Sequence, residues 1–167
     1  TSDIVTAAVD SVAVSGTGAA SVPGSLTNAT LRSFMSVSPA AILDGSETSD
    51  TLGWNFNSGG EAFDFLAQGE TLILTYTVSA TDDDGTPLSD TETVTITITG
   101  SNDVPTGAGS LTTTSLNDNA GATNLFGGLT VSDMDAGEND LSLTITLTDP
   151  TAGTLSGGGF TETGLGT

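Results

Sequence analysis

Two segments in which apolar residues alternate strictly with hydroxyl residues constrain the fold more than any other feature of the sequence. Segment 71–80 places mostly Thr or Ser between its apolar residues, which are Leu72, Leu74, Tyr76, Val78 and Ala80. Segment 91–99 repeats the pattern, with Val94, Ile96 and Ile98 set between Thr93, Thr95, Thr97 and Thr99. A period of two directs one face of a β-strand toward a core and the other toward water. Because turn-forming residues fill 82–87, we expect both strands to lie close together in one sandwich.

Weaker strand patterns continue along the rest of the chain. Alternation predicts a strand over 141–147, and shorter apolar runs at 4–14 and 129–131 are further strand candidates. No segment shows helical periodicity, so the sequence predicts an all-β protein.

A domain boundary is predicted at 100–105, where the sequence GSNDVP ends the second strong strand and leads into Gly- and Thr-rich sequence. We therefore expect a first domain over 1–105, a normal size for a seven-stranded sandwich, and a second over 106–167. The second is short for a sandwich. It is either cut off or completed by a strand that a neighbouring subunit donates.

The charge balance excludes several classes of partner. One Lys or Arg stands against 21 Asp and Glu, which gives a formal net charge of -20. Nucleic acids and anionic lipid surfaces are bound through Lys and Arg, so neither is expected as a partner. The chain has no run of about 18 apolar residues, and direct membrane insertion is not expected. Counter-ions must offset the repulsion between the carboxylates.

The residue types also argue against an enzyme. The chain contains no His and no Cys, and Arg32 is its single basic residue. A Ser nucleophile would therefore have no His to activate it. A pair of carboxylates of the glycosidase kind remains formally possible, but the sequence shows no signature of a deep pocket.

Segment 52–105 contains a series of short motifs, which in order are WNF at 54–56, FLAQGE at 65–70, YTV at 76–78, DDDG at 82–85 and ITGSNDVP at 98–105. Through these motifs the segment strongly resembles the VCBS repeats of large RTX-type bacterial surface adhesins. The same region resembles cadherin repeats, through ATD at 80–82 and the ND of 102–103. VSDMDAGEN at 131–139 resembles the motif that begins the next cadherin repeat. The resemblance implies Ig/cadherin-like antiparallel β-sandwich repeats in tandem.

In that family these motifs meet at the junction between tandem domains and bind Ca²⁺. By this resemblance Asp103, Asp133 and Asp135 supply carboxylates to the junction, while Asn102 and Asn139 supply carbonyl oxygens. Two positions depart from the family pattern. Ala67 stands where one acidic ligand is expected, so only Glu70 remains in that motif, and Gly100 stands in place of a linker Asp. One or two ions are therefore expected in place of three.

Asp82 and Asp84 form a second candidate group. Asp82 matches a family position that faces the opposite end of the domain, toward a preceding repeat. The 82–84 run is not an EF-hand loop, because it lacks the alternating oxygen ligands and the terminal Glu.

Calcium fits the available donors, since it takes six to eight hard oxygen ligands and the chain offers neither His nor Cys for zinc, copper or iron. Asp133 and Asp135 can aim two carboxylates at one point, and Gly137 lets the loop turn back. The alternative interpretation is that these Asp and Gly residues occupy exposed turns and keep the protein soluble.

The aromatic residues have two interpretations as well. Core packing is the favoured one, and a sugar-stacking surface is the alternative, for the set Trp54, Phe56, Phe63, Phe65 and Tyr76.

The resemblance implies an extracellular location at the bacterial cell surface. We expect a structural repeat, a spacer that calcium makes rigid or a segment that forms fibres, with neighbouring repeats of the same protein as partners. The alternative is an adhesion module that associates with itself or binds glycans, because the strands have Thr-rich faces and open edges.

Overall fold

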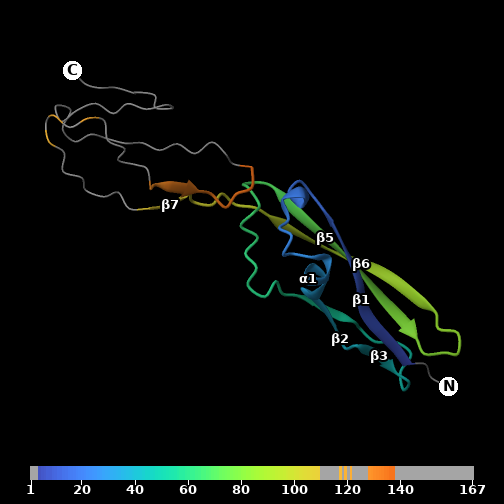
Figure 1. The fold of residues 1–167 in the computed structure, drawn as a ribbon. Helices are drawn as coiled ribbons and strands as arrows, with labels where there is room; N and C mark the ends of the chain where they lie inside the picture. The colour runs from blue at the N-terminus through green and yellow to red at the C-terminus, as the bar shows by residue number, and fades with distance from the viewer. Residues whose placement is uncertain (1–3, 110–116, 118, 120, 122–127, 138–167) are drawn as a thin grey trace.

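The computed structural model describes residues 4–109, 117, 119, 121 and 128–137 (Figure 1). The first unit contains β1 (Ile4–Ser15), η1 (Ala19–Ser21), α1 (Asn28–Ser33), β2 (Met35–Ser38), β3 (Ala41–Asp44), β4 (Gly53–Phe56), β5 (Thr71–Asp82) and β6 (Ser89–Thr99). Beyond the expected linker follow β7 (Thr106–Ala108) and β8 (Thr130–Ser132). The strand predicted at 141–147 and the candidate ligand Asn139 lie outside the described residues.

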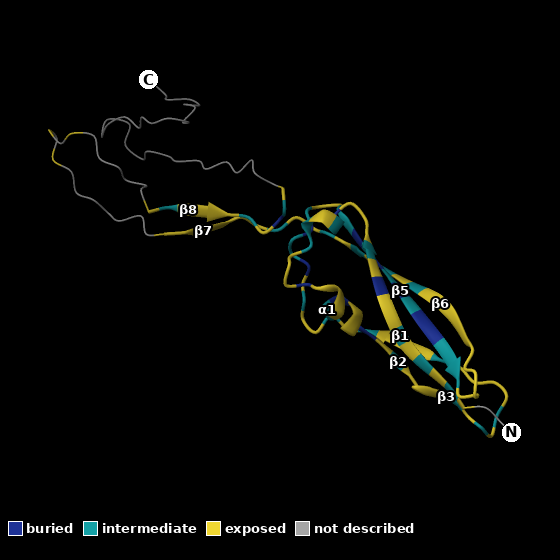
Figure 2. Cartoon of the chain, turned by 45° about the vertical axis from the view of Figure 1, so that its right-hand side comes forward, coloured by how far each residue is buried: buried dark blue, intermediate teal, exposed yellow. Residues whose placement is uncertain are grey.

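The main sheet is antiparallel and four-stranded, in the order β3-β1-β5-β6. β5 and β6 are the strands predicted at 71–80 and 91–99, and they pair without a break from Thr71↔Thr99 to Thr81↔Ser89. The weaker candidates at 4–14 and 129–131 are also strands, β1 and β8. Burial alternates along β5 and β6 as the pattern predicts, and Figure 2 shows the buried residues along β5.

The layer opposite the main sheet consists of shorter elements. β2 pairs with β4 from Met35↔Phe56 to Ser38↔Gly53, and α1 lies beside them. The described residues are predominantly β, with one curled antiparallel sheet. They do not form a second full sheet.

The helix α1 corrects the expectation of a chain without helices. Thr27 caps it, because its hydroxyl accepts a 3.2 Å hydrogen bond from the N–H of Thr30. With 6 residues, α1 makes fewer than about two turns, which is too short to leave a helical period in the sequence.

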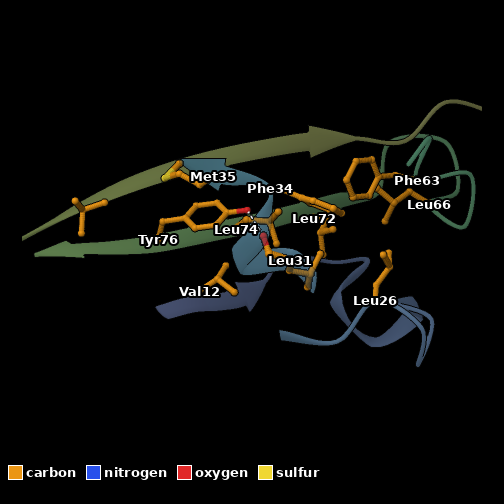
Figure 3. Packing of buried hydrophobic residues seen from close by; sticks show 11 residues of the cluster. Val12, Leu26, Leu31, Phe34, Met35, Phe63, Leu66, Leu72, Leu74 and Tyr76 are labelled. Atoms are coloured by element: carbon orange, nitrogen blue, oxygen red, sulfur yellow. Dashed lines mark hydrogen bonds between the residues drawn. The ribbon is translucent and has the colours of Figure 1, made fainter. Parts of the chain in front are cut away.

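The core lies between the inner face of the sheet and this second layer (Figure 3). Leu72, Leu74 and Tyr76 of β5 are fully buried, and so are Leu31 of α1 and Leu66. Leu26, Phe34, Met35 and Phe63 close the core from the opposite layer, while Val12 of β1 and Val78 of β5 extend it along the sheet. The Tyr76 hydroxyl donates a 2.8 Å hydrogen bond to the carbonyl oxygen of Leu31, which ties the central strand to the helix.

Core packing of the aromatic residues is confirmed for Phe63 and Tyr76, and it is wrong for Trp54. Trp54 is 52% exposed. It lies opposite Val37 of β2, which packs against the core, but Trp54 itself is not among the residues packed there. Phe56 still contacts Phe34 and Tyr76 edge to face. Among the described residues, no helix has the length and apolar character needed to cross a bilayer.

Candidate metal site at the junction

Hydrogen bonds join the loop that follows β8 to the first unit. The backbone N–H of Asp103, in the linker, donates to Oδ2 of Asp135 at 2.9 Å. The N–H of Ala136 donates to the carbonyl oxygen of Phe65 at 3.3 Å. The 133–137 loop therefore contacts both the linker and the 63–70 loop. Three of the predicted ligands, Asp103, Asp133 and Asp135, meet in this region.

The Asp-x-Asp pair is held by its own backbone. The N–H of Asp135 donates to Oδ1 of Asp133 at 3.1 Å, which holds the Asp133 carboxylate against the backbone of Asp135. Gly137 adopts a φ of +87°, a conformation that side chains disfavour, and so it turns the chain back as the sequence predicts.

Asp135 is the most unusual residue of the junction. It is 4% exposed, and its Oδ1 has no hydrogen-bond partner among the described residues. A buried carboxylate oxygen without a donor is costly, because water no longer solvates its charge. No Lys or Arg can supply the missing partner, since Arg32 is the only one in the chain and it binds carbonyl oxygens of β1. The arrangement suits a bound cation.

The neighbouring carboxylates repel one another. The pKa of Asp103 is raised, first by desolvation and then by the negative charges of Asp64, Asp135 and Asp133. A raised pKa means that the surroundings of Asp103 disfavour its ionised form. A divalent cation would reverse this preference, since it would favour every ionised carboxylate nearby.

Asp64 is the member of this group that the sequence does not predict. It lies in the 63–70 loop, two residues before Leu66, whereas the family pattern places its acidic residues after Leu66. The preceding residue, Phe63, has a φ of +60°, which is rare for a residue other than glycine. This turn keeps the Phe63 ring in the core, while Asp64 is half-buried beside the linker.

Asp64 and Asp103 both line a small cavity of about 50 Å³ between the 62–66 loop and the end of β6. Phe63, Leu66 and Gly100 are also among its lining residues. The volume is enough for a few water molecules.

Gly100 packs closely against the 66–70 loop. A Cβ atom at this position would lie 2.3 Å from the carbonyl oxygen of Leu66 and 2.4 Å from that of Ala67. The N–H of Gly100 also donates to the carbonyl oxygen of Glu70 at 2.9 Å. A side chain at this position would therefore clash with the backbone of the 66–67 loop.

Two other predicted ligands make local contacts. Oε2 of Glu70 accepts a 3.2 Å hydrogen bond from the N–H of Ala67, and so it closes its own loop. The side-chain amide of Asn102 donates to the carbonyl oxygen of Asp103 at 2.8 Å. Both contacts lie within the loops to which the two residues belong.

Asp82 and Asp84 lie at the opposite end of the sheet (Figure 1). β5 separates them from the junction by roughly 35 Å, at about 3.3 Å per residue. Oδ1 of Asp82 accepts a 2.9 Å hydrogen bond from the N–H of Leu88 across the β5–β6 turn. These two residues therefore cannot share a site with Asp103, Asp133 and Asp135.

In the part of the chain that the structure describes, no three acidic side chains come together closely enough to form a ready-made metal site. Ligation at the junction would need changes of side-chain rotamer. Comparisons with family models, with curated proteins and with solved structures found no match.

Proposed function

We propose that this chain is a structural repeat of a bacterial surface protein, extracellular, in which calcium stiffens the junction between tandem β-sandwich domains. The observation that carries the proposal is the buried Asp135, whose Oδ1 has no partner among the described residues, next to Asp64, Asp103 and Asp133. The motifs shared with VCBS and cadherin repeats supply the biological context.

The mechanism would be electrostatic. Without a cation, the carboxylates of the linker, of the 63–70 loop and of the 133–137 loop repel one another and push the two units apart. A bound Ca²⁺ would replace this repulsion with shared ligation and would fix the linker between the units. Binding would also stabilise the fold, since the ligands come together only in the folded chain.

Small-angle scattering of the protein in calcium and in chelator tests this role, with a double variant, Asp133→Asn with Asp135→Asn, as comparison. We expect calcium to narrow the distribution of distances in the wild type and to leave the variant unchanged. The control is Asp50→Asn with Asp90→Asn. It removes the same charge from exposed residues whose carboxylates accept from the next backbone N–H. If the variant responds to calcium as the wild type does, the junction is not the site.

A glycan-binding function is the second candidate, and the exposure of Trp54 favours it. An exposed indole on a strand can stack against the apolar face of a sugar ring. We expect Trp54→Ala to abolish any binding to a glycan array and to change stability little. An array on which the wild type binds nothing would remove this candidate.

A further inference from the structure

Among the described strands, β6 is a long edge strand with one hydrogen-bonded neighbour, β5. Its 11 residues pair with β5 in continuous register, and it lies at the outer rim of the sheet (Figure 2). Among the described residues, no strand pairs with the opposite side of its backbone. Such an edge is a template for another strand.

The other edges of the unit are short or protected. β3 and β4 have 4 residues each. Beyond β3, the edge of β1 carries a bulge at Asp10, where the pairing with β5 shifts register. Arg32 also covers this edge, because its guanidinium donates to the carbonyl oxygens of Asp10 at 3.1 Å and Val9 at 3.4 Å. Bulges and inserted charges are the usual means of blocking edge pairing.

β6 has none of these features over 93–99. The segment contains no Pro, no bulge and no charge, and it consists of the β-branched residues Thr93, Val94, Thr95, Ile96, Thr97, Ile98 and Thr99. The three inward residues pack against the core and remain half-buried, so that apolar surface continues up to the open edge. High β-propensity without charge favours strand pairing.

We propose that β6 pairs antiparallel with β6 of a second copy of this chain, about a two-fold axis at Ile96. In this register Ile96 faces Ile96 of the other copy, Thr95 faces Thr97, and Val94 faces Ile98. Inward residues thus meet inward residues, which a continuous sheet requires. Glu92 lies opposite Gly100 of the other copy, so the acidic residues of β6 do not face the same residues in the second chain. An eight-stranded sheet spanning two chains results.

The proposed pairing uses none of the candidate metal ligands, although Ile98 and Thr99 at the end of β6 line the same small cavity as Asp103. Because each chain carries a formal net charge of -20, the two copies repel at low ionic strength. The pairing should therefore strengthen several-fold as sodium chloride screens this repulsion, with chelator present throughout.

Single cysteines test the register, because the natural chain has none. Opposed Cα atoms of an antiparallel pair lie about 4.5–5.5 Å apart, within reach of a disulfide. In an oxidising buffer at high salt, we expect Ile96→Cys to give a covalent dimer. Thr91→Cys is the matched control on the same strand, since its two sulfurs would lie roughly 33 Å apart at about 3.3 Å per residue.

A second pair of variants guards against a folding defect in Ile96→Cys. Thr95 and Thr97 are exposed, so a mixture of a Thr95→Cys chain and a Thr97→Cys chain should give the mixed disulfide in preference to either symmetric one. The proposal is overturned if Ile96→Cys and the mixed pair cross-link no faster than Thr91→Cys. It is equally overturned if sedimentation velocity finds only monomer at high salt and high protein concentration.

Discussion

The backbone N–H of Asp103 donates a 2.9 Å hydrogen bond to Oδ2 of Asp135, across 32 residues of chain. One oxygen of a buried carboxylate thus joins the linker to the loop that follows β8, while the other oxygen has no partner among the described residues. The carboxylate of Asp135 therefore holds the junction together and also repels the acidic side chains around it. Its stability should therefore depend on cations and on protons.

Asp64 should contribute to cation binding, although the family pattern does not include it. Asp64→Asn removes one of the charges that raise the pKa of Asp103, and we expect calcium affinity to fall roughly tenfold, the scale of losing one supporting group in a metal site. Isothermal titration calorimetry measures the change. Asp50→Asn is the control, because it removes the same charge from an exposed residue. Equal affinities in both variants would exclude Asp64 from the site.

Asp103 should make the calcium-free protein less stable as pH rises. Its pKa in the folded state is raised above the ordinary value of 3.8, so the folded chain binds the proton more tightly than the unfolded chain does. The resulting penalty is absent below 3.8 and complete above the raised value. In chelator, the melting temperature of the wild type relative to Asp103→Asn should therefore fall from acidic to neutral pH.

Asp44 has the opposite slope, because hydrogen bonds from Ser46 lower its pKa. It is present in both proteins and cancels in their difference. A difference that is flat with pH would contradict the account of Asp103.

Gly100→Ala should destabilise the protein by about 2–3 kcal/mol, because the new Cβ would clash with two backbone carbonyls of the 66–67 loop. Denaturant unfolding measures the loss. Gly85→Ala is the matched control: no atom lies within 4 Å of a Cβ at that position, and a change below about 0.5 kcal/mol is expected. Similar losses in both variants would show that the close packing at Gly100 is not important.

Tyr76→Phe should cost about 1 kcal/mol, the net contribution of one hydrogen bond. The loss stays small because the carbonyl oxygen of Leu31 keeps a second donor, the N–H of Phe34 at 3.2 Å. Burial raises the pKa of Tyr76 to about 12. The contribution of the protonated Tyr76 hydroxyl to stability is present below the ordinary pKa of 10.0 and is lost as pH rises through the pKa of the folded state.

Tyrosinate absorbance measures this ionisation directly, since Tyr76 is the only tyrosine in the chain. Ionisation at the ordinary value in the folded protein would contradict the burial of the hydroxyl.

The sheet could be predicted because its signal is local and repeated. Leu72, Leu74 and Tyr76 alternate with hydroxyl residues, and a period of two has one structural meaning over such a length. The junction loop could be predicted in part, because Asp133 and Asp135 lie within one short motif. The motif does not show how deeply its residues are buried, because Asp135 is buried against residues that are distant in the sequence.

The remaining features depend on long-range packing. Asp64 follows Phe63, whose backbone conformation is left-handed, and the sequence gives no signal of that conformation at a phenylalanine. Trp54 looks like a core residue, and yet it is exposed although its cross-strand partner Val37 packs against the core. Arg32 lies in a helix that is too short to be recognised in the sequence, and from this helix it covers the edge of β1.

Thermal unfolding in calcium, in magnesium and in chelator tests the central claim most directly. Magnesium screens charge equally well but prefers a smaller and stricter octahedral site, so it controls for non-specific screening. The account predicts a large rise in melting temperature with calcium alone, and its loss in the variant Asp133→Asn with Asp135→Asn. Equal effects of calcium and magnesium, in both proteins, would mean that the acidic loops are solvated turns and that the junction holds no specific ion.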